Sequence, residues 1–383
     1  MRQRPVTLLT AALLAGLAVI AGIAWVRPHV FPAPLAPRLT LSIDRTRNPA
    51  HVARNRRLIS TSPLSLAVSP DGRTVAVGLG DGSVRVWDAV TGRFIRALTG
   101  FGDHVTALAF RPDGRVLACG SSNGEPIRLL DPISGELHGV VTGSAYDRFT
   151  ASQSLAYSPD GHKLVGSFYH QDFDHPVRGG EVAVFDPTDG SKVRVLASTS
   201  SGFARFTPDG AAVVFRQGSQ VVVAAADTGR PETTFKVPPG HMLSDPVAVS
   251  PDGASVAAMV DNGGSFATER WVTVWDRATG QERAAMTGHE QPLVALEYLP
   301  DGQTLVSASW DGTIRFWDVR RQAERLRITS RPGHNSLAHP PRKGFVPVMA
   351  AALSADGSVL AAADYDGTVR VWDVPALLAV TQP

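Results

Sequence analysis

The sequence predicts an all-β fold, a seven-bladed β-propeller of four-stranded antiparallel blades, preceded by one N-terminal transmembrane helix. Two observations lead to this prediction. A short turn motif recurs seven times through the body of the chain, and an uncharged apolar segment of 22 residues lies near the N-terminus. The 383 residues are 43% hydrophobic and 19% charged, a composition typical of globular proteins with an ample core.

The recurring motif is a tetrapeptide that ends in Asp-Gly, usually in the form xPDG and once as SADG. It occupies residues 69–72, 111–114, 158–161, 207–210, 250–253, 299–302 and 354–357. Successive copies begin 42 to 55 residues apart. Periods of roughly 20–50 residues indicate a solenoid, a propeller or a similar array.

A second motif follows each of these turns about 15–25 residues downstream, where an apolar residue precedes an aspartate. The seven pairs are Trp87-Asp88, Leu130-Asp131, Phe185-Asp186, Ala226-Asp227, Trp275-Asp276, Trp317-Asp318 and Trp372-Asp373. Because both motifs recur in the same order seven times, each unit is one copy of a repeat.

The turn chemistry indicates which array this is. In PDG, proline presets the φ angle of the turn and glycine accepts the left-handed position. Asp-Gly at 81–82, 311–312 and 366–367 suits a two-residue hairpin turn. Four short antiparallel strands in each unit, with no helical period between 61 and 383, predict the blades of a propeller.

One unit, GHEQPLVALEYLPDGQTLVSASWDGTIRFWD at 288–318, resembles the WD-repeat (WD40) β-propeller family. The resemblance extends over about 54–374. In that family a His, a Ser or Thr, an Asp and the Trp form a hydrogen-bonded structural tetrad, which gives a buried indole N–H and a buried imidazole their partners. The resemblance assigns this tetrad to His289, Ser307, Asp311 and Trp317.

Other units match the family less well. Val77 and Ala362 stand where the tetrad serine is expected. The resemblance therefore implies only partial tetrads, with members Asp81, Trp87, Asp366, Trp372 and Trp275. The fourth unit, near 203–227, has lost nearly all tetrad positions, which weakens that blade but leaves the fold prediction unchanged.

Closure of the ring needs one strand from the other end of the chain. The last unit supplies only three strands, near 348–353, 358–362 and 368–372. We predict that residues 54–60, RNRRLIS, supply the fourth, so that the propeller spans 54–374 and a C-terminal tail follows at 375–383. Deletion of 54–60 would then open the ring and expose an unpaired strand edge.

Residues 1–26 are predicted to be a transmembrane anchor or a signal segment. Residues 5–26 carry no charge, and about 20 apolar residues cross a bilayer as a helix. Signal peptides have shorter apolar cores of about 7–15 residues. The length favours an uncleaved anchor, although Gly22-Ile23-Ala24 offers a cleavage site, and cleavage would yield a secreted protein.

Residues 27–53 are rich in proline and arginine and predict a semi-extended spacer. Arg2, Arg4 and the amino group precede the apolar segment. This charge slightly favours a cytoplasmic N-terminus, so a single-pass protein would hold its propeller on the extracytoplasmic side.

Charge and cysteine content exclude some function classes. Residues 1–60 contain nine Arg and one Asp, a net charge of +8, and the remaining 28 basic and 34 acidic residues give −6. A nucleic-acid-binding protein would concentrate basic residues on its folded domain, so no nucleic-acid partner is expected. Cys119, the one cysteine, is predicted to be a buried apolar residue.

Insertions indicate a binding face. With strands named a to d from the inside outwards, the b–c and d–a loops share one face of a propeller. The five longest insertions fall on that face, at 142–152, 169–179, 237–245, 261–270 and 330–347. Such insertions mark binding faces in repeat proteins, or reflect tolerance where the tetrad has decayed. Aromatic residues predicted on this face as partner contacts are Tyr169, Phe173, Phe266, Trp310, Phe345 and Tyr365.

The resemblance implies a non-catalytic scaffold that binds a protein or peptide, with no catalytic residues, cofactor or metal. The alternative is an extracytoplasmic enzyme or metal-dependent binder that uses the loop at 168–181. That loop contains the metal-ligand types His170, Asp172, Asp174 and His175. A solvated polar insertion explains the same cluster without function, and the sequence favours that explanation.

Overall fold

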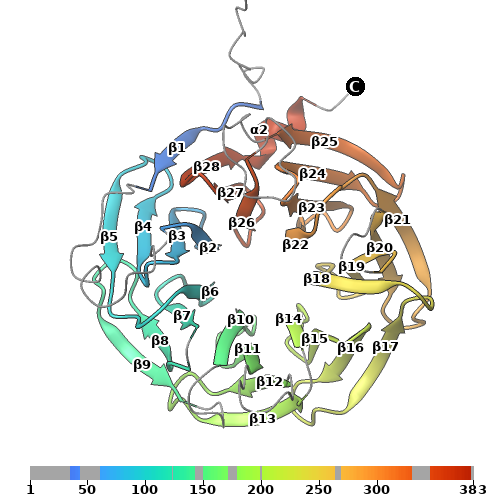
Figure 1. Ribbon diagram of the computed structural model, residues 1–383, viewed down its shortest axis with the longest axis horizontal. Coiled ribbons are helices and arrows are strands. Elements are labelled where there is room, and N and C mark those ends of the chain that lie inside the picture. The colour runs from blue at the N-terminus through green and yellow to red at the C-terminus, as the bar shows by residue number, and fades with distance from the viewer. Residues whose placement is uncertain are drawn as a thin grey trace, which may run out of the picture. The chain divides into compact units, whose positions relative to one another are not determined.

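The computed structural model describes residues 35–43, 61–122, 124–142, 150–170, 179–198, 201–263, 269–329 and 346–380. The chain divides into two units, Met1–Ala36 and Pro37–Pro383, and every strand belongs to the second. The strands form seven separate four-stranded antiparallel sheets. Figure 1 shows these sheets as blades around a central axis, which confirms the predicted propeller.

Each blade runs from an inner strand a to an outer strand d. Blades 1 and 2 contain β2 (Pro63–Val68), β3 (Thr74–Leu79), β4 (Val84–Asp88) and β5 (Phe94–Leu98), then β6 (Val105–Phe110), β7 (Leu117–Ser121), β8 (Ile127–Leu130) and β9 (Leu137–Val141). Blades 3 and 4 contain β10 (Thr150–Tyr157), β11 (Leu164–His170), β12 (Gly179–Phe185) and β13 (Lys192–Ala197), then β14 (Ser201–Phe206), β15 (Ala212–Gln217), β16 (Gln220–Ala225) and β17 (Pro231–Lys236).

The remaining blades follow the same order. Blades 5 and 6 contain β18 (Met242–Val249), β19 (Ser255–Asp261), β20 (Arg270–Asp276) and β21 (Glu282–Thr287), then β22 (Leu293–Tyr298), β23 (Thr304–Ser309), β24 (Thr313–Asp318) and β25 (Ala323–Thr329). Blade 7 contains β26 (Val348–Leu353), β27 (Val359–Asp364), β28 (Thr368–Asp373) and β1 (Leu39–Ser42).

The recurring tetrapeptide, xPDG in six blades and SADG in blade 7, forms the a–b turn of every blade. In blade 3, Gly161 has φ +75°, the left-handed conformation that glycine adopts without strain. Asp160 Oδ1 accepts hydrogen bonds from Ser158 Oγ at 2.5 Å and from the backbone N–H of His162 at 3.0 Å. The hydrogen bond from Ser158, and after it the one from the His162 N–H, lowers the pKa of Asp160. The motif therefore fixes each turn through side-chain to backbone bonds.

Ring closure differs from the prediction. The edge of β28 is occupied by β1, with Leu39 opposite Val371 and Ser42 opposite Thr368. The prediction that 54–60 fills this position is therefore wrong, and residues 54–60 lie outside the described residues. The spacer prediction for 27–53 is wrong in the same place, because Leu41 and Ile43 are buried in the core of blades 1 and 7.

The C-terminal tail also begins with regular structure. Helix α2 (Val374–Ala379) follows β28 directly, and Asp373 caps it by accepting a hydrogen bond from the Ala376 backbone N–H. Pro375 occupies the first turn, where its missing N–H costs nothing. Val374 and Leu377 are buried, so the helix is anchored to the propeller.

The hydrophobic core lies between neighbouring blades. The cluster between blades 5 and 6, for example, joins Met259 and Met286 to Leu296, Leu305 and Trp317. No helix in the described parts of the chain is long and apolar enough to cross a membrane. The predicted transmembrane segment, residues 5–26, lies outside the described residues.

Candidate functional site

The four residues assigned to the tetrad form one chain of hydrogen bonds in blade 6. Trp317 Nε1 donates to Ser307 Oγ at 2.8 Å, and Ser307 Oγ lies 2.7 Å from His289 Nε2. His289 Nδ1 lies 2.7 Å from Asp311 Oδ2. The chain joins strands b and c, the d–a loop and the b–c turn, so it ties the b–c/d–a face of this blade together.

The protonation states follow from burial and partners. Burial lowers the pKa of His289 more than the hydrogen bond to Asp311 raises it, so the imidazole is neutral at pH 7. Burial alone would raise the pKa of Asp311, but bonds from His289, Thr313 and Glu290 outweigh it and lower that pKa to about 2. With a neutral imidazole protonated on Nδ1, each hydrogen bond has one direction. The indole N–H donates to Ser307 Oγ, the Ser307 hydroxyl donates to His289 Nε2, and His289 Nδ1–H donates to Asp311.

A Ser, a His and an Asp in hydrogen-bonded order also describe a hydrolytic triad. Here the serine is fully buried, with 0% exposure. Its oxygen already accepts the indole proton of Trp317. A nucleophile must reach a substrate carbonyl, so this constellation is structural.

The members of the partial tetrads have other partners in blades 1 and 5. In blade 1, Asp81 Oδ1 accepts from the Ser83 backbone and hydroxyl, and Trp87 packs edge-on against Phe94. In blade 5, Trp275 packs against Phe235 with ring centroids 5.7 Å apart.

In blade 7 the buried acid is Asp364, two residues before the expected Asp366. Asp364 pairs with Arg370 inside the blade. Asp366 is exposed and only accepts the Thr368 backbone N–H at 2.9 Å. Trp372, on β28, is buried. Sequence reasoning missed Asp364 because the motif places the acid inside the turn.

A ring of bulged residues surrounds the central channel. Every inner strand carries a register shift near its start, at the end that follows the d–a loop. A bulge turns an extra residue away from the paired ladder. One bulged residue from each blade lines the channel: Leu64, Thr106, Gln153, Phe203, Pro246, Val294 and Met349. We call these seven residues the bulge ring.

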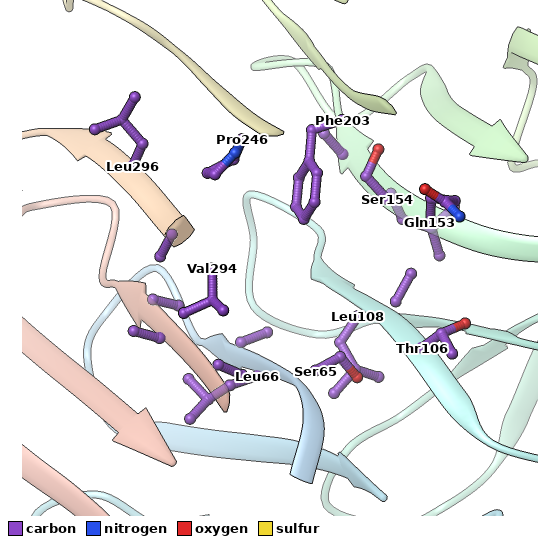
Figure 2. A pocket seen from close by; sticks show the side chains of 18 of the residues that line it. Ser65, Leu66, Thr106, Leu108, Gln153, Ser154, Phe203, Pro246, Val294 and Leu296 are labelled. Atoms are coloured by element: carbon purple, nitrogen blue, oxygen red, sulfur yellow. The ribbon is translucent and has the colours of Figure 1, made fainter. Parts of the chain in front are cut away.

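The bulge ring encloses one end of a channel with a volume of about 620 Å³. Phe203, Pro246 and Val294 surround this cavity in Figure 2. Five ring residues are apolar, and the two polar ones, Thr106 and Gln153, are neighbours on blades 2 and 3. The mouth of the channel is therefore an apolar arc with one polar segment.

Deeper in the channel the inner strands have small side chains at matched positions, with two exceptions. Two positions before the a–b turn tetrapeptide, five blades have alanine, whereas blade 4 has Arg205 and blade 6 has Glu297. Burial raises the pKa of Glu297, against the opposing effects of Arg205 and a backbone bond from Leu353. The channel interior thus carries one cation and one acid in apolar surroundings.

Three of the aromatic residues predicted as partner contacts are described. Trp310 lies in the b–c turn of blade 6, lines the channel and is 50% exposed. Tyr365 lies in the b–c turn of blade 7, and Tyr169 near the end of strand b in blade 3; both are half-buried. Phe173, Phe266 and Phe345 lie outside the described residues.

The strand order makes each of the five predicted insertions a b–c or d–a connection. Half or more of each of four insertions lies outside the described residues, and 237–245, between β17 and β18, is described throughout. The metal-ligand types Asp172, Asp174 and His175 also lie outside them, as does the side chain of His170. The described residues contain no group of three His, Cys, Asp or Glu able to hold a metal.

Comparison with known proteins supports the prediction of a repeat protein. The family "WD domain, G-beta repeat" matches residues 57–88, 92–125, 280–318 and 330–373. Periodic tryptophan protein 2 of Saccharomyces cerevisiae is 26% identical over 308 residues, which are 80% of this chain and 30% of that protein. Nuclear distribution protein PAC1 of Gibberella zeae is 34% identical over 145 residues, 36% of this chain and 29% of that protein.

A third relative is the cell division cycle 20.1 protein of Arabidopsis thaliana, named as a cofactor of the APC complex. It is 26% identical over 269 residues, 67% of this chain and 54% of that protein. The chain spans about a third or less of the first two relatives and about half of the third. The four matched segments, which together cover less than half of the chain, and the seven-bladed fold make the chain similar to WD40-repeat β-propeller proteins.

Proposed function

We propose that the chain is an interaction scaffold that binds a protein or peptide through its b–c/d–a face, with the bulge ring as the central anchor site. The observation that carries this proposal is the apolar arc of the ring beside the exposed indole of Trp310. Aromatic side chains at the edge of an apolar recess are frequent energetic anchors of protein interfaces.

The composition of the ring supports one chemistry for the bound segment. Phe203, Pro246 and Val294 offer an apolar surface to one aliphatic or aromatic side chain. Gln153 is exposed on the polar segment, and its amide can both donate to and accept from a peptide backbone. A segment with one apolar anchor next to free backbone amides fits both parts. The name of the CDC20.1 relative, a cofactor of a complex, agrees with this class of function.

Site-specific photo-cross-linking tests the proposal. A benzophenone amino acid at position 310 of the full-length chain should cross-link a protein partner in native membranes or extracts. The same amino acid at Thr228, exposed in a c–d turn on the opposite face, is the matched control. A partner captured at 228 and never at 310 would contradict the proposed face.

A second proposal concerns the membrane, and the 22-residue uncharged segment at 5–26 supports it. We place this segment as a single-pass anchor, with the propeller on the extracytoplasmic side. Alkaline extraction should leave the full-length chain in the membrane, and protease added to sealed cells should cut the propeller. Release by alkali, or protection from external protease, would contradict the anchor or its orientation respectively.

A further inference from the structure

The outer edges of the blades are of two kinds. The outer strands of blades 1 to 3 expose large apolar side chains, each 40–48% accessible: Phe94, Leu137, Val140, Val193 and Val195. We call these five residues the apolar rim. The outer strands of blades 4 to 6, which are β17, β21 and β25, expose no large apolar side chain along their described lengths. Their apolar residues, such as Phe235 and Met286, point inwards and are buried.

The neighbouring c–d turns extend the apolar rim. Val90 in blade 1 and Ile133 in blade 2 are each more than half exposed. Seven of the ten exposed large apolar residues in the described parts of the chain thus lie on the outer edge of three adjacent blades. Single exposed apolar residues are normal, but a contiguous group indicates an interaction surface.

The outer strands of both halves carry a positive net charge, which is larger on the strands of the apolar rim. The strands β5, β9 and β13 contain Arg96, Lys192 and Arg194 and no acidic residue, a net charge of +3. The strands β17, β21 and β25 contain three glutamates and four basic residues, a net charge of +1. Exposed apolar side chains on strands of positive net charge suit the surface of a bilayer that contains anionic lipids.

The position where the chain enters the propeller points to the same surface. Arg38 donates to the carbonyl oxygen of Ala89 at 3.0 Å, and Leu41 packs in the cluster that contains Trp87 and Ala89. Arg38 therefore lies beside the c–d turn of blade 1, where the apolar rim begins. Residues 27–38 separate β1 from the apolar segment, and twelve residues span at most about 43 Å.

From these observations we infer that the apolar rim docks on an anionic lipid surface, so that the propeller lies edge-on against the membrane that holds its N-terminal segment. The inference rests on the proposed membrane anchor. A tether this short raises the local concentration of lipid, so that weak contacts suffice. Edge-on docking leaves the b–c/d–a face and the bulge ring free for a protein partner.

Spin-label accessibility tests the inference. Cys119 is fully buried, so a nitroxide reagent reacts only with an introduced cysteine. Val193→Cys places the label on the apolar rim, and Thr234→Cys places it at an exposed position of β17 as the matched control. The full-length chain is reconstituted into vesicles of phosphatidylcholine, with and without phosphatidylglycerol. Access of oxygen and of a water-soluble nickel complex is then measured.

In vesicles with phosphatidylglycerol, the label at 193 should lose nickel access and gain oxygen access, whereas the label at 234 should stay in water. Arg194→Glu in the Val193→Cys background should restore nickel access. Equal nickel access at 193 and 234 would overturn the inference. A loss of nickel access at 193 that grows with the protein-to-lipid ratio, and that brings no gain in oxygen access, would also overturn the inference. In that case a second copy of the chain, and not lipid, would cover the rim.

Alkaline extraction of the same samples separates this inference from the anchor. A chain that resists extraction while position 193 stays in water keeps the anchor and overturns the docking. The label at 193 can also enter the lipid of phosphatidylglycerol vesicles at neutral pH while alkali releases the chain. That result supports the docking and overturns the anchor.

Discussion

Arg216 and Asp245 form a bidentate ion pair across the boundary between blades 4 and 5, with nitrogen–oxygen distances of 3.1 and 2.9 Å. Asp245 also accepts the backbone N–H of Phe203, a bulge-ring residue, at 3.0 Å. The pair lies on the b–c/d–a side of a blade that has lost its tetrad. The ion pair therefore joins blades 4 and 5 on the same face of the propeller where blade 6 has its hydrogen-bonded tetrad.

Removing one partner of this pair should destabilise the propeller. Asp245→Ala leaves the mostly buried Arg216 and the Phe203 N–H without their acceptor, and we expect a loss of about 1–3 kcal/mol in the free energy of unfolding. Urea unfolding measures it. Glu232→Ala, which breaks the more exposed Glu232–Arg277 pair between the same blades, should change stability by less than about 0.5 kcal/mol. Equal effects would contradict a special role for Asp245.

The tetrad makes a second prediction. Ser307→Ala removes the acceptor of the Trp317 indole proton and the donor to His289, both inside the core. We expect a loss of about 2–3 kcal/mol, because buried polar groups without partners pay their full desolvation cost. The exposed Thr228→Ala is the control in thermal unfolding. A Ser307→Ala variant as stable as the control would show that the hydrogen-bonded chain adds nothing.

Acid should destabilise the protein through Asp311. Its pKa in the folded protein, about 2, is below the ordinary value of 3.8, so its contribution to stability is present above pH 4 and is lost as pH falls towards 2. The shift corresponds to about 2 kcal/mol. Urea unfolding of the wild type and Asp311→Asn between pH 5 and 2 should show the two curves converging. A constant difference over that range would contradict the assignment.

His289 acts in the same direction at higher pH. Its pKa is lower in the folded state than the ordinary 6.5, so the unfolded chain binds the proton first and stability falls as pH drops below about 6.5. His289→Gln should flatten this part of the stability profile. An unchanged slope between pH 7 and 5 in the variant would mean that other groups cause the acid sensitivity.

The observed closure gives a fifth prediction. Leu41→Asp places a charge in the core beneath β1, and we expect the backbone amides of β28 to lose protection from hydrogen exchange while blades 3 to 5 keep theirs. Deletion of 54–60 should leave β28 protected, since its two neighbours are β27 and β1. The opposite pattern would restore 54–60 as the closing strand.

Local chemistry explains what the sequence could predict. The xPDG turns, the Asp-Gly hairpins and the Trp-Asp pairs are signals within a few residues, and they suffice to predict seven blades. The closing strand is non-local: LTLS at 39–42 is only four residues long within a proline-rich stretch. The alternative RNRRLIS borders the first blade directly, and proximity in sequence favoured it wrongly.

The candidate site divides in the same way. His289, Ser307, Asp311 and Trp317 belong to one repeat, so one motif predicts all four. The bulge ring takes one residue from each of seven blades, and no residue type identifies a bulge along one strand. Arg216 and Asp245 lie 29 positions apart in different blades, and only the packing of the blades brings them together.

The affinity of the partner captured at position 310 tests the central claim most directly. With purified proteins, Trp310→Ala should weaken binding at least about tenfold, as expected for an interface anchor, while Thr228→Ala on the opposite face leaves the affinity unchanged. An unchanged affinity for Trp310→Ala, together with a loss for Thr228→Ala, would show that the partner binds the a–b/c–d face and would contradict the proposed site.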